Sequence, residues 1–194
     1  GVMFDWLRRN NRDMDDCGER SPLKHLDRFG VLSDNCLAVH VNYLAEGDAR
    51  LLARRKASVA HCPRSHAYFG HEEFPFNTLT RIKVNICLGT DSLATVYKKP
   101  RQTVELNMFA EMQAFAATHP RVAPDQILRM ATVNGARALG MEGEAGEITE
   151  KALADLIAIP FRGKMEDAHE AAVHHKGGVL ASMIDGEWAV ELHD

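Results

Sequence analysis

Short apolar segments separated by amphipathic stretches dominate the first half of the chain. Residues 36–41, 58–62 and 84–88 are three such segments, with little alternation of apolar and polar positions. Between them, residues 46–56 and 76–82 carry apolar side chains at helical spacing. Apolar runs of strand length that do not alternate are typical of parallel strands buried on both faces. We therefore expect a parallel α/β sheet in this part of the chain.

Helical patterns flank this region on both sides. The first thirty residues are helical in pattern, and a second short helix is expected over residues 22–30, where Pro22 stands in the first turn. Within the sheet region, residues 63–75 are expected to form a loop rich in His, Tyr, Phe and Gly. Two longer helices are expected over residues 102–118 and 124–140. The first would place these side chains along one face: Val104, Met108, Met112 and Phe115.

The composition changes near residue 145. Glycines at 140, 143 and 146 mark the change. Beyond it, residues 154–160 and 179–190 have strand-like patterns, the latter with an Asp185-Gly186 turn, and residues 165–175 are helical in pattern. We expect a small β-rich segment over residues 146–194.

Composition and charge exclude several classes of protein. With 45% hydrophobic and 26% charged residues, the 194-residue chain has the composition of a soluble globular protein of one to two domains. The formal net charge is −4, and lysines and arginines are scattered among acids, so we expect neither nucleic acid nor a membrane surface as a partner. No apolar run approaches the roughly 18–20 residues that span a bilayer.

The cysteines and the first residues indicate the cellular compartment in which we expect the protein. Cys17, Cys36, Cys62 and Cys87 are widely spaced and form no CxxC pair, which excludes a zinc knuckle and indicates reduced thiols in the cytoplasm. Neither a charged nor a long apolar leader follows Gly1. We therefore expect no signal peptide, and a chain that begins inside a longer sequence.

Candidate chemistry stands at the carboxyl ends of the three expected strands. His40 closes the first, His61 the second, and Asp91 follows the third. Active sites of parallel α/β folds lie at that edge, and two histidines with a carboxylate are suited to a divalent metal and the water it activates. Taken singly, each has a structural alternative: a hydrogen-bonded histidine at His40 or His61, and a helix N-cap or an Asx turn at Asp91.

Two further features near the second strand have alternatives of their own. His66 and His71 lie in the expected loop, where they contact substrate or are simply surface polar residues. Cys62 is a poor candidate nucleophile beside His61, because adjacent strand residues point to opposite faces.

At these residues the sequence resembles the carboxyl-terminal half of the amidohydrolase superfamily, in its deaminase and chlorohydrolase branch. The resemblance covers the chain from about residue 30. It is carried, in order, by Ala38-Val39-His40, Val59-Ala60-His61-Cys62-Pro63-Arg64-Ser65, residues 84–92 ending in Gly-Thr-Asp-Ser, and residues 106–112, 130–140 and 154–157.

The resemblance implies a fold larger than this chain. Residues 1–145 would be part of a TIM (β/α)8 barrel, with strands six, seven and eight ending at His40, His61 and Asp91. Residues 146–194 would be the carboxyl-terminal segment of a composite β-sandwich domain.

The resemblance also implies roles for single residues. Asp91 would be a metal ligand and the base that takes a proton from the metal-bound water, and His40 would orient that water and shuttle protons. His61, Arg64 and His66 would lie on the substrate side. The implied cofactor is Zn²⁺, or another divalent metal such as Fe²⁺. The implied reaction is hydrolytic deamination of a small heterocycle, with chlorohydrolase or other amidohydrolase activity as the alternative.

The chain departs from the family pattern in its metal ligands. It contains no HxH motif, which relatives carry on strand one, and it lacks the equivalents of strands one to five. A carboxylate with at most one further ligand does not make a three-ligand catalytic zinc site. We expect residues 1–194 to be part of a longer enzyme and inactive alone. The alternative is a non-catalytic binding or scaffold protein that completes its sheet by homo-oligomerisation.

Overall fold

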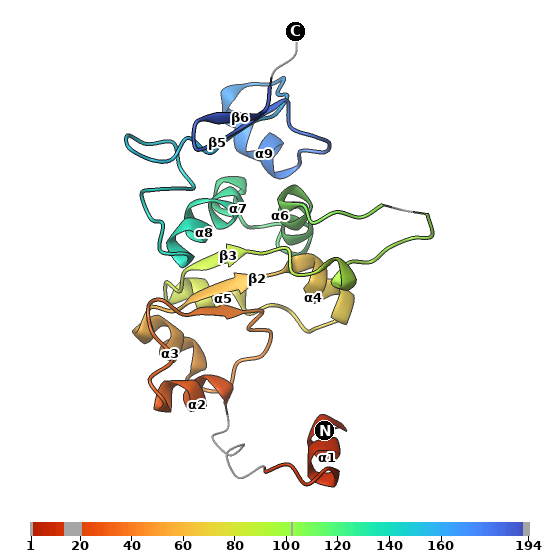
Figure 1. Ribbon diagram of the computed structural model, residues 1–194, viewed down its shortest axis with the longest axis vertical. Coiled ribbons are helices and arrows are strands. Elements are labelled where there is room, and N and C mark those ends of the chain that lie inside the picture. The colour runs from red at the N-terminus through yellow and green to blue at the C-terminus, as the bar shows by residue number, and fades with distance from the viewer. Residues whose placement is uncertain (1, 14–20, 102, 192–194) are drawn as a thin grey trace.

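A three-stranded parallel sheet lies at the centre of the computed structural model, which describes residues 2–13, 21–101 and 103–191. The strands β1 (Leu37–Val39), β2 (Ser58–His61) and β3 (Ile86–Leu88) are paired in the order β1-β2-β3 (Figure 1). All four residues of β2 are buried. The parallel sheet predicted from the apolar runs is confirmed.

The helices between these strands differ from the prediction at one place. Helix α3 (Asp48–Arg55) joins β1 to β2, and α5 (Phe76–Arg81) precedes β3, both as expected. The predicted loop after β2 is wrong in its first half, because α4 (Pro63–Phe69) forms there. Proline in the first turn of a helix loses no hydrogen bond, so Pro63 begins this helix and does not break it.

The helices after the sheet are shorter than predicted. Helix α6 (Met108–Thr118) begins after Asn107, whose Oδ1 accepts the Phe109 N–H at 2.9 Å, so Val104 lies outside the helix. The predicted helix over residues 124–140 is two helices, α7 (Pro124–Ala131) and α8 (Val133–Ala138). They are separated by Thr132, which is not helical at φ −127 and ψ −96. The single turn η1 (Leu93–Thr95) lies between β3 and α6.

Two helices precede the sheet. Helix α1 (Val2–Arg9) has no buried residue and lies apart from the rest in Figure 1. Helix α2 (Pro22–Arg28) is capped by Ser21, whose Oγ accepts the N–H groups of Leu23 and Lys24 and donates to Asp48 Oδ1 at 2.6 Å. This hydrogen bond ties α2 to the start of α3.

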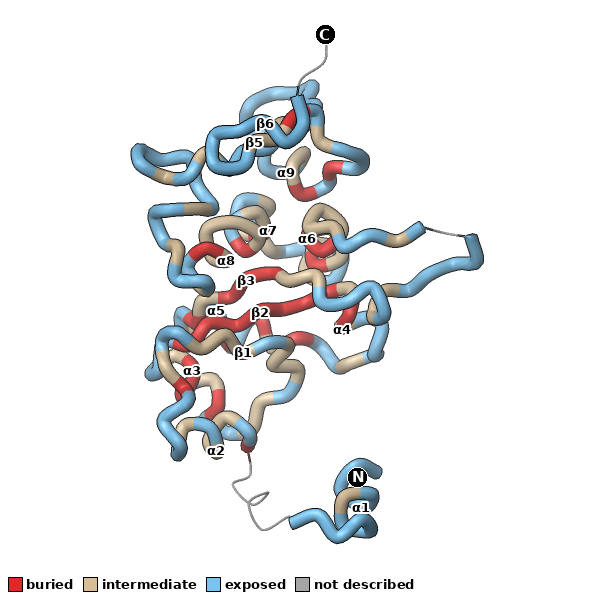
Figure 2. The backbone as a smooth tube through the Cα atoms, in the orientation of Figure 1, coloured by how far each residue is buried: buried red, intermediate tan, exposed pale blue. Residues whose placement is uncertain are grey.

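The core lies around the sheet, where Figure 2 shows the buried residues concentrated. In Figure 1, α6 to α8 lie on the β3 side and α2 and α3 on the β1 side. Cys62 and Cys87 are buried free thiols and Cys36 is a half-buried one, whereas Cys17 lies outside the described residues. The largest fully buried apolar side chains are Phe115, Leu52, Leu79, Ile127, Met130, Val59 and Val173.

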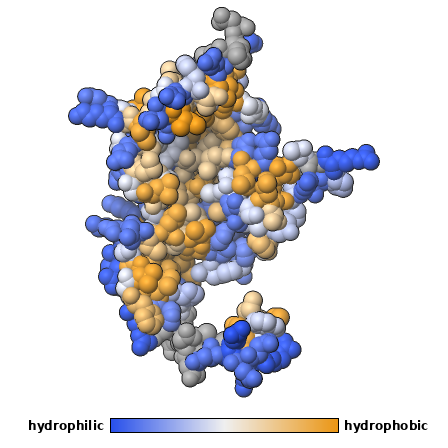
Figure 3. All heavy atoms as spheres, viewed as in Figure 1, coloured by the Kyte–Doolittle hydropathy of each residue, from blue (hydrophilic) through white to orange (hydrophobic). Residues whose placement is uncertain are grey.

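Apolar side chains also remain exposed. Figure 3 shows them gathered over much of the face in view. Val39, at the end of β1, is 52% exposed, and Tyr97, after η1, is 67% exposed. Within the described residues β1 and β3 each pair on one side only, so the sheet has two open edges.

A second sheet forms the carboxyl-terminal segment. Strands β4 (Leu156–Ala158), β5 (Ala181–Ile184) and β6 (Glu187–Val190) are antiparallel in the order β4-β5-β6, with Asp185-Gly186 at the turn. The turn η2 (Met165–Asp167) leads into α9 (Ala168–Val173), which packs against α6 and α7. The β-rich segment is confirmed, and the division into two domains near residue 145 stays a prediction.

The helices in the described part of the chain are too short to span a membrane. Its longest helix, α6, has 11 residues, and no helix there could cross a membrane.

Candidate functional site

The structure brings His40 and Asp91 together at the carboxyl edge of the sheet. His40 directly follows β1, and Asp91 lies three residues beyond β3. His40 Nε2 is 3.9 Å from Asp91 Oδ2, and the side chains are 41% and 27% exposed. Both residues have positive φ, 71° and 52°. Strained backbone of this kind is concentrated at functional sites, because the surrounding fold must hold it in place.

Two hydroxyl groups hold the carboxylate of Asp91. Ser65, buried in α4, donates from Oγ to Asp91 Oδ2 at 2.6 Å, and Thr95 donates from Oγ1 to the same oxygen at 3.2 Å. The Ser65 hydrogen bond, with the Thr95 hydrogen bond and the nearby His40, holds the pKa of Asp91 below its ordinary value. Asp91 is therefore an oriented, ionised carboxylate, suited to bind a cation or to accept a proton.

A small cavity lies beside this pair. Its volume of about 70 Å³ is far below the roughly 300 Å³ of a typical ligand pocket, so it has room for a few water molecules and not for a heterocycle. His66 and His71 share the lining, with rings 5.4 Å apart, and Asn42 Oδ1 lies 3.0 Å from His66 Nδ1. The lining residues are His40, Asn42, Ser65, His66, Phe69 and His71.

His61 does not line this cavity, but its ring contacts that of His66, which does. Its ring is 2% exposed, stacks on Phe74 with centroids 3.9 Å apart, and meets the edge of His66 at 5.1 Å. Nδ1 is buried and has no hydrogen-bond partner among the described residues. Burial, with the neighbouring histidines, lowers the pKa of His61 to about 3. His61 is therefore neutral at pH 7, and its contact with substrate stays a prediction.

The lowered pKa of His61 predicts acid destabilisation. The unfolded chain protonates this histidine near pH 6.5 and the folded chain only near 3, so stability is complete above 6.5 and falls as the pH drops toward 3. The loss through His61 is on the order of 3–5 kcal/mol. His61→Phe keeps a ring on Phe74 and should flatten this dependence in urea unfolding at pH 7 and pH 4. An unchanged dependence in that variant would contradict the assignment.

Arg64 is held by a buried acid that the sequence reasoning missed. Its Nε donates to Glu111 Oε1 at 2.5 Å, its backbone N–H donates to Oε2 at 3.0 Å, and Nη1 donates to the Glu105 carbonyl at 3.1 Å. Glu111 is fully buried, and burial raises its pKa while the contacts with Arg64 oppose the rise. Nη2 of Arg64 is buried without a partner among the described residues, and the contact of Arg64 with substrate stays a prediction.

A signal for Glu111 was present in the sequence. This acid stands three residues after Met108 and four before Phe115, on the apolar face of α6. A carboxylate at such a position needs a cationic partner when it is buried. The partner, Arg64, lies 47 residues earlier, which the pattern does not show.

The described residues do not complete a metal site. Within residues 2–13, 21–101 and 103–191, no three or more His, Cys, Asp or Glu side chains are grouped to hold a metal ion. Catalytic zinc takes three protein ligands, and this edge offers Asp91 with His40 beside it. Cys62 adds no thiolate, because burial raises its pKa to about 12. The described residues alone do not fit a catalytic zinc ion.

The sequence of this chain matches a known protein family and several curated proteins. Residues 11–189 match the family model described as "Amidohydrolase family". A 5-methylthioadenosine/S-adenosylhomocysteine deaminase of Syntrophobacter fumaroxidans is 38% identical over 150 residues, which are 74% of this chain and 33% of the relative. The chain thus spans about a third of the length of its curated relatives.

Solved structures are similar over most of this chain. A zinc-bound adenosine deaminase from Xanthomonas campestris matches with a TM-score of 0.75 and 28% identity, over 96% of this chain and 42% of that one. A zinc-bound atrazine chlorohydrolase from Arthrobacter aurescens matches with a TM-score of 0.75 and 18% identity, over 92% and 41%. The second likeness shows the fold alone.

Proposed function

The chain belongs to the amidohydrolase family, in the branch of the 5-methylthioadenosine/S-adenosylhomocysteine deaminases, and from that premise we propose that it supplies part of the active site of a hydrolase acting on non-peptide C–N bonds. The reaction proposed is hydrolytic deamination of a small aminated heterocycle. The observation that carries the proposal is the ionised Asp91 beside His40 at the carboxyl edge of the sheet.

We assign β1, β2 and β3 to strands six, seven and eight of a (β/α)8 barrel. The parallel order with helical crossovers and the two open edges support the assignment, since a barrel pairs both edges. Residues 1–145 would then be barrel and residues 146–194 part of a β-sandwich, in keeping with the antiparallel sheet β4-β5-β6.

The side chains have distinct proposed roles. Asp91, which the hydroxyl groups of Ser65 and Thr95 hold in position, accepts a proton from the attacking water. His40, 3.9 Å away, orients the water and passes the proton toward the departing ammonia. We assign His66, which lines the cavity beside His40, and Arg64 to the substrate side, and the neutral His61 contacts the ring of His66.

Zinc enters the proposal through the relatives. Solved relatives contain it, and Asp91 is the ligand that we assign to a divalent metal whose other ligands come from outside the described residues. When bound, such a metal lowers the pKa of its water and so supplies a nucleophile at neutral pH.

Metal analysis tests this assignment. After dialysis against zinc and then buffer, residues 1–194 should retain no stoichiometric zinc, because the described ligands are too few. The protein expressed from the full open reading frame that contains residues 1–194 should retain it. Stoichiometric zinc on residues 1–194 that Asp91→Asn leaves in place would contradict the assignment.

A non-catalytic binding protein is the second candidate, favoured by the incomplete ligand set of the described residues. Product analysis separates the candidates. Ammonia released from 5-methylthioadenosine or a related heterocycle by the full-frame protein supports the deaminase. Chloride released from a chlorinated triazine supports a chlorohydrolase. If the full-frame protein releases neither ammonia nor chloride, the result supports the binding protein.

A further inference from the structure

Helix α4, which carries Ser65, has no capping side chain of its own. The first N–H groups of a helix have no partner within the helix and need another acceptor. Cys62 stands in the capping position and makes no side-chain hydrogen bond, and Pro63 has no N–H to donate. The Arg64 N–H is therefore the first backbone donor of α4, and it donates to Glu111 Oε2 at 3.0 Å.

Glu111 supplies the missing cap from a different helix. A capping side chain ordinarily precedes its helix and accepts the N–H of the second or third helical residue. Arg64 is the second residue of α4, and its acceptor comes from α6, which packs against α4. The other carboxylate oxygen of Glu111 accepts Arg64 Nε at 2.5 Å, so both oxygens are engaged with one residue. Glu111 is fully buried, so bulk water does not compete with this acceptor.

The same turn of α4 holds Asp91, one residue after Arg64. Ser65 is 1% exposed, and its Oγ donates to Asp91 Oδ2 at 2.6 Å. A hydrogen bond this short is lost when the donor moves by a fraction of its length, so Ser65 holds the carboxylate only while the first turn of α4 keeps its place. Glu111, Arg64, Ser65 and Asp91 therefore link α6, through α4, to the loop after β3.

We propose that Glu111 is a positioning residue, which holds the first turn of α4 so that Ser65 keeps the Asp91 carboxylate oriented for the reaction. Glu111 acts through Ser65 and does not itself touch the reacting atoms. The ion pair with the Arg64 side chain is not its whole role, because Oε2 accepts a backbone N–H and not a side-chain donor. The inference rests on the function proposed above, in which Asp91 accepts the proton.

A double-mutant cycle in the protein expressed from the full open reading frame tests the inference. Ser65→Ala removes the hydroxyl that holds Asp91, and Glu111→Leu removes the acceptor that holds the turn. Each should lower kcat for ammonia release about tenfold with KM unchanged. The double variant should be no slower than the slower single variant, since both changes act on one contact. Losses in kcat that multiply to about 100-fold, or a rise in KM without a loss in kcat, would overturn the inference.

Amide hydrogen exchange of the same full-frame protein, resolved to single residues, tests the geometry without turnover. In the wild type the Arg64 amide should exchange about tenfold more slowly than that of Asp125, or slower still. Asp125 is the matched amide, because it is also second in a helix, α7, that begins with proline and has no side-chain cap. Glu111→Leu should remove this protection, whereas Glu111→Gln, which keeps an oxygen for the N–H, should preserve most of it.

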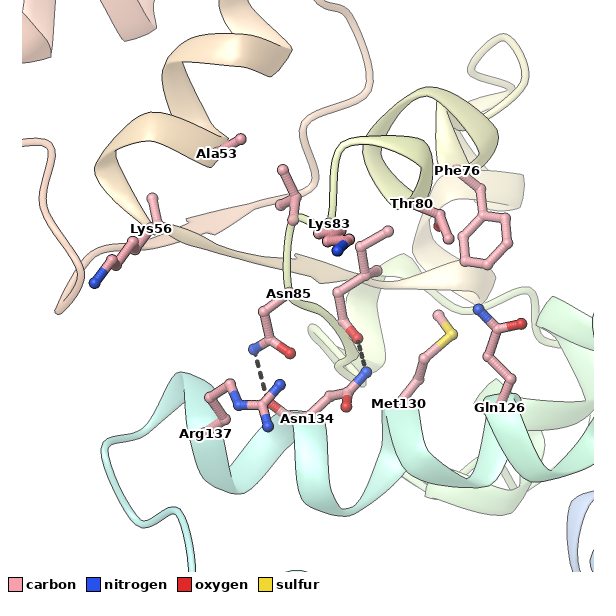
Figure 4. A pocket seen from close by; sticks show the side chains of 13 residues that line it. Ala53, Lys56, Phe76, Thr80, Lys83, Asn85, Gln126, Met130, Asn134 and Arg137 are labelled. Carbon is pink, nitrogen blue, oxygen red and sulfur yellow. Dashed lines mark hydrogen bonds between the residues drawn. The ribbon is translucent and has the colours of Figure 1, made fainter.

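Asn134→Ala is the matched control for a lost hydrogen bond between a helix side chain and the backbone of another element. Asn134, beside the cavity drawn in Figure 4, donates from α8 to the Ile86 carbonyl at 2.8 Å, at the amino end of β3. This variant should leave the exchange of the Arg64 amide unchanged. The inference is overturned if the wild-type Arg64 amide exchanges as freely as that of Asp125, or if Asn134→Ala speeds its exchange as much as Glu111→Leu does. If the wild type releases no ammonia, the proposed function fails, and the exchange result alone decides whether Glu111 holds α4.

Discussion

Asp91→Asn is expected to lower kcat for ammonia release by about 10³-fold or more in the protein expressed from the full reading frame. Asparagine keeps the shape of Asp91 and an oxygen for the Ser65 hydroxyl, which donates at 2.6 Å. It has neither the negative charge to hold a metal nor the basicity to take a proton from water. The rate of ammonia release, with circular dichroism to confirm folding, checks the prediction.

Asp185→Asn is the matched control for this variant. Asp185 is also an aspartate with positive φ, 51°, but it lies in the turn between β5 and β6. We expect this control to keep the wild-type rate. A folded Asp91→Asn protein with a near-wild-type rate would contradict both roles assigned to Asp91.

Glu111→Leu is expected to destabilise the chain by about 3–5 kcal/mol. The change removes a fully buried carboxylate and leaves Arg64, whose side chain is only 16% exposed, without its counter-charge. It also removes the acceptor of the Arg64 N–H near the start of α4, the helix that carries Ser65. Urea unfolding at pH 7 measures the loss.

The double variant Arg64→Leu/Glu111→Leu distinguishes the cost of leaving Arg64 as an unpaired buried charge from the cost of losing the ion-pair contact itself. With no charge left in the interior, the double variant should be more stable than Glu111→Leu alone, because a buried pair is often replaced by apolar side chains at little cost. A loss below about 1 kcal/mol for Glu111→Leu would show that Arg64 is solvated without its partner.

The sheet could be predicted because its strands are buried on both faces. Residues 58–61 are all buried, and an apolar run without alternation is what such a strand requires. Helix α4 was missed because its aromatic and histidine side chains are not helical in pattern, although Pro63 stood where a first turn accepts proline. The break at Thr132 could not be seen, because the apolar spacing continues across it.

The candidate site was predictable to the extent that strand ends define it. His40 and Asp91 were placed together by the rule that the carboxyl ends of parallel strands meet at one edge. The same rule did not show that His61 is buried against Phe74, since this depends on which face of β2 its side chain occupies. Nor did it show Glu111, which reaches Arg64 from a helix far along the chain.

Ammonia release from 5-methylthioadenosine, measured side by side for residues 1–194 and for the full-frame protein with zinc, tests the central claim most directly. We expect no release by residues 1–194, and catalytic release by the full-frame protein that a chelator abolishes and zinc restores. A full-frame protein with no HxH motif that releases no ammonia from any aminated heterocycle would contradict the claim.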